Sequence, residues 1–324
     1  MEYRRLGKSG LQLSALSLGS WLTIGKSVDE KISEKLMITA YDNGINFFDG
    51  AEVYANGQAE TVMGKVLKKT KWNRTSYVVS SKAFFGIQGE KSKPNERGLS
   101  RKHLVEACHE ALKRMQVEYL DLYLCHRPDK NTPMEEVVFT MNHLIQQGKI
   151  FYWGTSEWSA AEIMEAHMIA RQNNLIGPTV EQAEYNMFVR RRMEADFAPI
   201  FKNIGLGTTV WSPLNSGILT GKYNSGIPKN SRLATAGLEW LRDREVQADK
   251  IKKVVQLEKI ANKLDCKMSQ LALAWCLRNP DVSTVILGAT SLVQLKENIK
   301  SLAVLPLLTD SVNEAIELVL NNKP

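Results

Sequence analysis

Short apolar runs alternate with amphipathic stretches along most of the chain. Three segments each end a helical pattern, place a glycine and continue into an apolar run: AYDNGINFFDG, LIQQGKIFYWGTS and KNIGLGTTVWSPL. Glycine suits the left-handed residue that closes a helix, so each segment is interpreted as a helix followed by a strand. The apolar residues before Gly44 recur at helical spacing and predict one buried face, formed by Ile32, Leu36, Met37 and Ala40.

Five further apolar runs are interpreted as strands, which makes eight with the three above. They are SALSLGS (14–20), SYVVSSKA (76–83), YLDLYLCHR (119–127), TVEQAEY (179–185) and STVILGA (283–289). Helical patterns follow nearly all of them. Ser100 is expected to cap one helix, and Thr132 to cap another that has Pro133 at its first position and Glu135 in its first turn.

Eight alternating strand–helix units predict an α/β fold, a (β/α)8 TIM barrel, with residues 1–324 forming a single domain. An open doubly wound sheet is the alternative, but such sheets usually carry G-x-G-x-x-G after the first strand, and the chain has none. Residues 2–13 read as an N-terminal β-hairpin turning at GKSG, which could plug the barrel floor. Residues 217–247 form a long polar loop after the seventh strand, and we interpret it as a lid.

Composition narrows the class of protein. No apolar run is long enough to cross a membrane, and no signal peptide is evident. The four cysteines have no C-x-x-C spacing, so neither a disulfide framework nor a metal site is expected, and a cytoplasmic location fits better. The net charge of +7 is concentrated in residues 65–74 and 189–193. Solvated helix ends explain these runs better than nucleic-acid binding, because stacking aromatic residues do not interleave them.

Polar residues follow the predicted strands at the end where barrels of this type carry their chemistry. In chain order they are Asp49, Tyr54, Lys82, His126, Ser156, Gln182, Trp211 and Ser212. Taken singly, each has a structural explanation, such as a loop cap, a packing residue at the rim, or a lysine that extends to solvent. Four of them on consecutive strand ends favour a shared site over four separate structural roles.

The residue types of Asp49, Tyr54, Lys82 and His126 suit proton transfer to a carbonyl oxygen. Tyrosine loses its proton near pH ~10 and needs a stabilised phenolate to act near neutral pH. An ammonium beside it supplies that stabilisation, and a carboxylate holds the ammonium in place. Histidine can hydrogen-bond the carbonyl oxygen. This set of groups predicts reduction of an aldehyde or ketone.

These four residues, in their order and local context, resemble the catalytic tetrad of the aldo-keto reductases. The resemblance runs from YRRLGKSGLQLSALSLGSW to ILGATSLVQLKENI, and the branch most similar to the chain is that of the voltage-gated potassium channel β-subunits. Long segments carry it, among them ERGLSRKHLVEACHEALKRMQVEYLDLYLCHRPDKNTPMEE, YWGTSEWSAAEIMEAH, EQAEYNMF, TGKYNSGIP and LALAWCLRNP.

The resemblance implies an extended NADP(H) over the barrel mouth, without a Rossmann motif. It places the nicotinamide against Trp211, with Ser156 and Gln182 on its carboxamide. The other implied cofactor contacts are Gly19, Ser20, Trp21, Asp49, Ser212, Leu214, Gly217, Lys222, Arg232, Gly288, Thr290, Gln294, Glu297 and Asn298. The substrate would meet Trp21, Tyr54, Phe84, Phe85 and His126.

The segment ILGATSLVQLKEN independently predicts a phosphate site, because a strand and a glycine turn lead to a helix N-terminus. Ser291 and Gln294 also have the spacing of a capping box, and both interpretations stay open.

Two departures from the channel-subunit pattern favour an enzyme. Animal channel β-subunits carry asparagine where this chain has His126, and some of them have a long N-terminal extension. A third departure is Glu157, where many reductases have asparagine; its effect on the cofactor is left open. The leading hypothesis is an NADPH-dependent reductase of aldehydes, with ketones as a further class of substrate. The alternative is a cofactor-sensing regulator of a potassium channel, and the resemblance implies a homotetramer.

Overall fold

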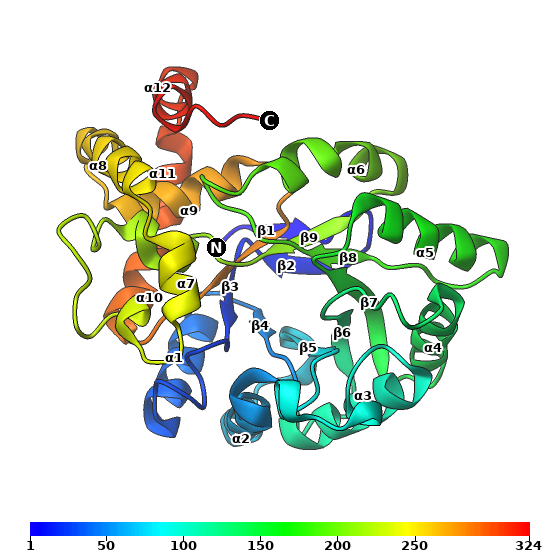
Figure 1. The fold of residues 1–324 in the computed structure, drawn as a ribbon. Coiled ribbons are helices and arrows are strands. Elements are labelled where there is room, and N and C mark those ends of the chain that lie inside the picture. The colour runs from blue at the N-terminus through cyan, green and yellow to red at the C-terminus, as the bar shows by residue number, and fades with distance from the viewer.

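The computed structural model describes residues 1–324, and eight parallel strands close into a barrel at its centre (Figure 1). The barrel strands are β3 (Leu16–Gly19), β4 (Phe47–Asp49), β5 (Val78–Ala83), β6 (Leu120–Cys125), β7 (Ile150–Ser156), β8 (Val180–Gln182), β9 (Gly207–Val210) and β10 (Thr284–Leu287). Their order around the barrel follows the chain, and β10 pairs with both β9 and β3. All eight predicted strands are confirmed, and the open sheet is excluded.

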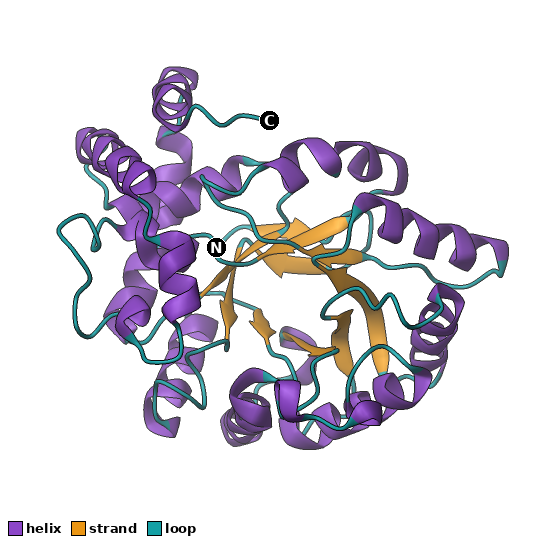
Figure 2. Ribbon diagram, viewed as in Figure 1, coloured by secondary structure: helices purple, strands orange, loops and turns teal.

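Helices surround the strands as an outer layer (Figure 2). They are α1 (Glu30–Asp42), α2 (Gln58–Thr70), α3 (Arg101–Met115), α4 (Met134–Gln146), α5 (Ala160–Gln172), α6 (Ala198–Ile204), α7 (Glu239–Glu245), α8 (Ala248–Lys263), α9 (Met268–Arg278), α10 (Leu292–Ile299), α11 (Ser301–Val304) and α12 (Asp310–Leu320). Gly44, Gly148 and Gly205 have φ values of 85°, 67° and 66°, so the three predicted helix-to-strand turns do use glycine's left-handed conformation. No helix is long and apolar enough to cross a membrane.

Two local predictions need correction. Ile32 is 38% exposed, and Ser33 occupies the buried face of α1 beside Leu36, Met37 and Ala40. Thr132 does not cap α4, because the hydroxyl of Thr132 donates to Asp129 Oδ2 at 2.8 Å. Helix α4 therefore begins directly after Pro133. The cap at Ser100 is confirmed, since its Oγ accepts from the backbone N–H of His103 at 3.3 Å.

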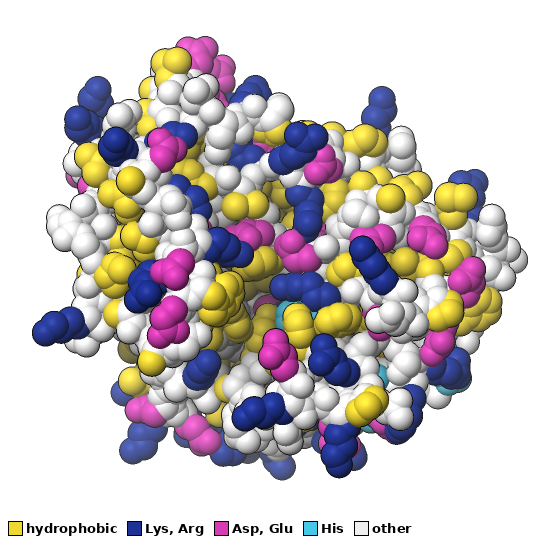
Figure 3. Space-filling view, in the orientation of Figure 1, with side chains coloured by type: hydrophobic (Ala, Val, Ile, Leu, Met, Phe, Trp, Pro, Cys, Tyr) yellow, Lys and Arg dark blue, Asp and Glu magenta, His cyan; other side chains and the backbone are white.

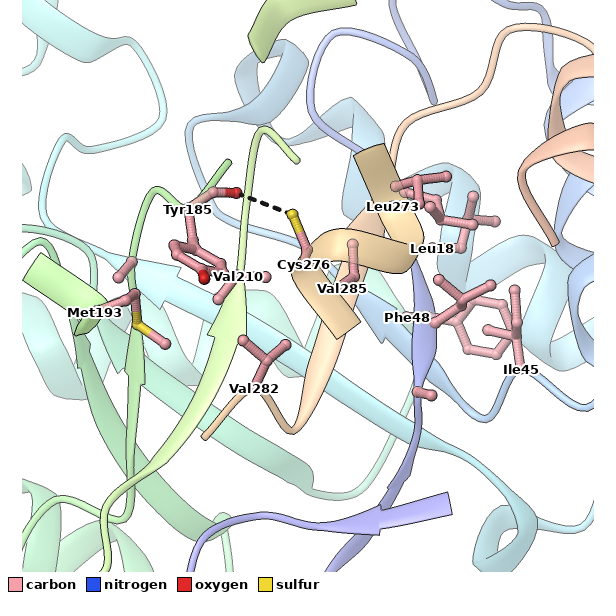
Figure 4. Close-up of a cluster of buried hydrophobic side chains, with 14 of the residues drawn as sticks. Leu18, Ile45, Phe48, Tyr185, Met193, Val210, Leu273, Cys276, Val282 and Val285 are labelled. Carbon is pink, nitrogen blue, oxygen red and sulfur yellow. Dashed lines mark hydrogen bonds between the residues drawn. The ribbon is translucent and has the colours of Figure 1, made fainter. Parts of the chain in front are cut away.

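The main core lies between the outer faces of the strands and the helices. Figure 4 shows part of it, where Leu18 and Phe48 on β3 and β4 lie among side chains that include Leu273 of α9. In the same view the thiol of Cys276 points at the backbone oxygen of Tyr185, 3.7 Å away. Burying the outward apolar side chains of the strands under the helices is what fixes each helix on the barrel.

A second, smaller core fills the barrel floor. The strands β1 (Tyr3–Arg5) and β2 (Gln12–Ser14) form the predicted N-terminal hairpin. Leu6 and Leu13 pack against inward-facing side chains of four barrel strands, namely Phe47, Val78, Leu122, Leu124 and Val180. Arg4 joins the hairpin to the last turn of α9 and the loop before β10 by donating to Leu277 O at 2.8 Å and Val282 O at 3.0 Å. The hairpin therefore closes the floor of the barrel, as predicted.

The segment between β9 and α8 holds two short 3₁₀ turns, Asn215–Thr220 and Arg232–Ala234, and the helix α7. In Figure 1 helix α7 of this segment lies beside β3 and α10, at one side of the barrel. The segment contains all of residues 217–247, the loop that the sequence analysis interpreted as a lid.

Candidate functional site

Strand alternation creates a polar layer directly above the apolar floor. Side chains two residues apart point the same way on a strand, so the inward face changes from Phe47 to Asp49 on β4. On β5 the inward face runs from Val78 through Ser80 to Lys82. The register pairs Phe47 with Val78 and Asp49 with Ser80, which aligns the polar layers of the two strands.

Asp49, Lys82 and Tyr54 form one hydrogen-bonded chain in this layer. The ammonium of Lys82 lies 2.7 Å from Asp49 Oδ2 and 2.8 Å from Gly50 O. It also donates to the hydroxyl oxygen of Tyr54 at 3.2 Å. The Lys82 side chain is completely buried, and three oxygens take its three N–H donors. The structure thus brings together the residues that the sequence predicted on neighbouring strand ends.

Burial and neighbouring charges have opposite effects on the pKa values of Lys82 and Tyr54. Burial lowers the pKa of Lys82, but the attraction of Asp49 and Tyr54 outweighs it and keeps that pKa above its ordinary value. Burial also raises the pKa of Tyr54, and Lys82 opposes that rise without cancelling it. The sequence analysis expected Lys82 to bring the Tyr54 pKa down. In the folded protein Tyr54 instead keeps its proton at neutral pH and can give it away.

His126 completes the group on the next strand end. Its ring centroid lies 5.7 Å from that of Tyr54, in an edge-on arrangement. Burial, followed by the positive charges of Lys82 and Arg127, holds the pKa of His126 well below its ordinary value. The imidazole is therefore neutral near pH 7. Its Nδ1 is buried without a hydrogen-bond partner, and Nε2 is the ring nitrogen that opens toward the cleft.

Three further side chains support Asp49, and the sequence analysis missed two of them. The hydroxyl of Ser80 and the amide of Gln182 both donate to Asp49 Oδ1, at 2.8 Å and 3.0 Å. The Gln182 amide also donates to Thr209 Oγ1 at 3.1 Å. Alternation could have found Ser80 and Thr209, because each lies two residues before a predicted site residue, Lys82 and Trp211.

A cleft of approximately 1500 Å³ opens above the tetrad. Figure 3 shows the hollow near the middle of this face, with basic side chains along its rim. Most of the residues implied by the resemblance line it: Gly19, Trp21, Asp49, Tyr54, Phe85, His126, Ser156, Gln182, Trp211, Ser212, Leu214, Gly217, Lys222, Arg232, Gly288, Thr290, Gln294, Glu297 and Asn298. The volume exceeds the range of about 300–1,000 Å³ usual for single small ligands, so it has room for a dinucleotide together with a substrate.

Three of the predicted site residues do not line the cleft. Lys82 lies beneath Tyr54 and acts only through its neighbours. Ser20 turns its hydroxyl onto the backbone oxygen of Asp49, at 2.9 Å. Phe84 packs against the main core, and its ring meets that of Phe85 edge-on at 5.1 Å. Both phenylalanines lie in the bend after β5 ends at Ala83, so strand alternation no longer sets their direction, and only Phe85 reaches the cleft.

One part of the cleft, which we call the phosphate arm, is lined by Lys222, Arg232, Thr290 and Gln294. Its hydrogen-bond donors fit an anionic ligand. Arg232 forms no salt bridge although its environment is desolvated enough to lower its pKa, and its guanidinium lies over the Trp21 ring at 5.7 Å. Lys222 also lacks a carboxylate partner and packs beside Gly217, whose φ is 97°. Lys222 is exposed to solvent, but the desolvated guanidinium of Arg232 is costly to leave unpaired, and the phosphates of a dinucleotide would pair with both cations.

Residues at the start of α10 also line the phosphate arm. Ser291 caps the helix by accepting from Gln294 N at 3.3 Å. The Gln294 carboxamide oxygen accepts from the backbone N–H and the hydroxyl of Thr290, at 2.9 Å and 3.0 Å. The reciprocal bond of a capping box, to Ser291 N, is therefore not made. Thr290, just before the helix, and Gln294, in its first turn, both line the cleft.

Glu157 organises the wall beside Ser156. Its backbone has a φ of 63°, in the region that non-glycine residues rarely adopt. Its Oε1 accepts from Trp211 Nε1 at 3.0 Å and from the backbone N–H of Glu184 at 2.8 Å. Its Oε2 pairs with Arg192. The carboxylate thus holds the indole of Trp211 in position, a role that the sequence left open.

Comparison with known proteins agrees with this geometry. Residues 15–320 match the family described as "Aldo/keto reductase family". Two curated plant proteins, each named "Probable voltage-gated potassium channel subunit beta", are 50% identical to the chain over 325 aligned positions. One is from Arabidopsis thaliana and the other from Oryza sativa subsp. japonica. Each alignment covers 100% of this chain and 98% of the relative.

Proposed function

Because the chain belongs to the aldo/keto reductase family, we propose that it is an NADPH-dependent reductase of aldehydes whose activity extends to ketones. Members of this family are oxidoreductases that generally bind nicotinamide cofactors. The observation that carries the proposal is the buried Asp49–Lys82–Tyr54 chain, which ends beside a neutral His126 in a cleft large enough for cofactor and substrate.

The reaction needs a hydride at the carbonyl carbon and a proton at the carbonyl oxygen. The bound reduced nicotinamide supplies the hydride, and with it both electrons. Tyr54 gives its hydroxyl proton to the oxygen as negative charge develops there. Lys82 stabilises the phenolate that remains, and solvent later returns the proton. Asp49 holds Lys82, so the ammonium needs no reorganisation when the charge appears.

His126 would bind the carbonyl oxygen from the other side. A neutral imidazole can donate one N–H without competing with Tyr54 as an acid, and Nε2 is the nitrogen that faces the cleft. Trp21, Phe85 and the edge of Tyr54 offer an apolar surface for the rest of the substrate. These contacts suit aromatic or hydrophobic aldehydes.

The proposed preference for NADPH rests on the cations of the phosphate arm. We propose that Trp211, Ser156 and Gln182 hold the nicotinamide end, and that Ser212, Leu214, Gly217 and Lys222 meet the diphosphate. Arg232, Thr290 and Gln294 would take the 2′-phosphate, with Glu297 and Asn298 near the adenine. The unpaired guanidinium of Arg232 is the main support for a phosphate there.

The test is oxidation of NADPH at ~340 nm with an aldehyde panel that includes 4-nitrobenzaldehyde and methylglyoxal, for the wild type and Tyr54→Phe in parallel. Because phenylalanine has no proton to give, Tyr54→Phe should lose at least ~100-fold in turnover while binding NADPH nearly as before. Lys82→Met should lose at least as much, since it removes the charge that stabilises the phenolate. Full turnover in either variant would contradict this mechanism.

The second candidate is a cofactor-sensing regulator of a potassium channel, with little turnover. The 50% identity to plant proteins named as probable channel β-subunits favours it. Under this second proposal the protein is a cytoplasmic homotetramer that binds a channel. Tight NADPH binding without turnover of any aldehyde would support the regulator over the reductase, whereas turnover that disappears in Tyr54→Phe would support the reductase.

A further inference from the structure

Arg127 is a cation in the cleft that the proposed reaction does not use. It directly follows His126 and lies half-buried in the cleft wall. One nitrogen, Nη1, donates to His126 O at 2.5 Å and weakly to Ser156 Oγ at 3.4 Å. Its Nε and Nη2 donate to no protein group, and no carboxylate forms a salt bridge with it.

Apart from Arg232 in the phosphate arm, which also lacks a carboxylate partner, several buried or half-buried arginines of the chain behave differently. Arg74 pairs with Asp121 at 2.7 Å, and Arg114 pairs with Glu60 at 2.6 Å. Arg190 pairs with both Glu194 and Glu317, at 2.8 Å and 2.6 Å. A half-buried cation normally keeps a carboxylate partner because desolvating an unpaired charge is costly. The free Nε–Nη2 edge of Arg127 is therefore a place for an anion that comes from outside the chain.

The position of Arg127 separates it from the cations of the phosphate arm. Lys222 and Arg232 belong to the segment after β9, and Arg232 lies next to Gly288 at the end of β10. Arg127 follows β6, which is four strands from β10 in either direction around the barrel of eight. It therefore faces the tetrad from the side opposite β10, where a dinucleotide would not place its 2′-phosphate.

The surroundings of Arg127 place the expected anion close to the reacting carbonyl. The ring of Phe85 lies close to both His126 and Arg127, with its centroid 5.0 Å from that of His126 and 5.5 Å from the Arg127 guanidinium carbon. A substrate whose carbonyl oxygen is held by Tyr54 and His126 would run along this ring. Its far end would then lie toward Arg127, so a short spacer would join the two ends of the substrate.

We propose that Arg127 is a specificity-determining residue that selects carbonyl substrates bearing a carboxylate, held by a bidentate pair with its free guanidinium edge. This inference rests on the proposed reductase function. A guanidinium matches the planar geometry of a carboxylate, so lysine is not an equivalent replacement. The apolar wall at Phe85 and the cation at Arg127 together predict an aromatic or similarly short acid with an aldehyde at its opposite end.

The experiment compares 4-carboxybenzaldehyde with its neutral methyl ester, methyl 4-formylbenzoate, by NADPH oxidation. Wild type, Arg127→Met, Arg127→Lys and the control Arg171→Met, an exposed arginine of α5, are measured together. We expect the wild type and the control to favour the acid by about tenfold or more in kcat/KM, a typical value for a charge-assisted hydrogen-bonded pair. Arg127→Met should abolish this ratio and Arg127→Lys should restore only part of it. Because the ratio compares two substrates on the same protein, a general loss of activity lowers kcat/KM for both substrates and leaves the ratio unchanged.

Equal kcat/KM for the acid and the ester in the wild type, or an unchanged ratio in Arg127→Met, would overturn the inference while leaving the reductase intact. A loss of NADPH affinity in Arg127→Met as large as the loss of the ratio would overturn it as well, because Arg127 would then serve the cofactor. If no aldehyde is reduced, the proposed function fails separately. Benzoate and benzamide binding in the presence of NADP(H), followed by tryptophan fluorescence, then decides. Tighter binding of benzoate that disappears in Arg127→Met supports the anion site, and equal binding of the two ligands overturns it.

Discussion

Tyr54 and His126 are neighbours in one cleft wall, and burial moves their pKa values in opposite directions. It raises the pKa of the Tyr54 phenol and lowers that of the His126 imidazole, because in each case the charged form loses its water. Both side chains are consequently neutral near pH 7. The cation of the group is Lys82, whose charge Asp49 balances at 2.7 Å. The site therefore holds one proton donor and one neutral hydrogen-bonding group around the expected carbonyl oxygen.

The buried imidazole predicts a pH dependence of stability. Since the folded pKa of His126 lies well below its unfolded value, the unfolded chain binds more protons below pH ~6.5, and stability falls as the pH drops from there. Between pH ~7 and pH ~5.5 this one group should cost about 1 kcal/mol. We expect His126→Asn, which cannot titrate, to lose about that much less stability than the wild type in urea unfolding at the two pH values. Equal losses in both proteins would contradict the prediction.

At the scale of elements, the ends of β7, β8 and β9 are joined by a single side chain. Glu157 follows β7, accepts from Glu184 N beyond β8, and holds Trp211 beyond β9. Its left-handed backbone turns the carboxylate toward both partners, and such a conformation costs of the order of 1 kcal/mol or more unless the surroundings hold it. The wall proposed to hold the nicotinamide is therefore built by one strand-end residue acting on two neighbours.

This arrangement predicts how variants of Glu157 behave. Glu157→Ala removes the acceptor for the Trp211 indole and should weaken NADPH binding about tenfold, because an unpaired buried donor costs about 1–3 kcal/mol. Glu157→Gln keeps an oxygen acceptor of the same size and should stay within about threefold of the wild type. Alanine and glutamine would both adopt the same left-handed backbone at this position, so backbone strain does not explain a difference in NADPH affinity between the two variants. Fluorescence titration with NADPH would contradict the prediction if alanine and glutamine had the same effect.

For the whole molecule, the N-terminal hairpin acts as part of the barrel core. Leu6 and Leu13 are completely buried against inward-facing residues of β4, β5, β6 and β8. The polar layer with Asp49 and Lys82 lies directly above that floor. A packed floor excludes water from below, so the low-dielectric surroundings of the tetrad depend on residues distant from it in sequence.

Removing a floor side chain should therefore destabilise the protein strongly. Leu13→Ala is expected to cost about 2–5 kcal/mol, the range for a large-to-small change in a packed core. Leu318→Ala is the matched control, because Leu318 is 82% exposed on α12 and should change stability by no more than about 0.5 kcal/mol. Urea unfolding of the three proteins gives the comparison. A similar small change for both variants would show that the hairpin does not belong to the core.

Much of the fold could be predicted from the chain alone. Periodicity and the glycines at positions 44, 148 and 205 identified all eight barrel strands, because these signals are local and strong. The errors arose where a long-range partner decided the outcome. Thr132 bonds to Asp129 instead of capping α4, and Ile32 lies where no other element covers α1. A sequence pattern shows that a side chain can cap or pack, but not whether a competing partner is present.

By itself the sequence determined which residues stand at the strand ends, since the order of strands along the chain places Asp49, Tyr54, Lys82 and His126 on neighbouring strands. Only the tertiary structure decided how buried these residues are, how their pKa values shift and which charges are paired. Only the closed barrel shows that Lys82 is fully buried, that burial outweighs its effect on the Tyr54 pKa, and that Arg127 has no carboxylate partner. The reason is physical: strand order is a property of the chain, whereas desolvation and charge pairing depend on which distant groups fold around a side chain.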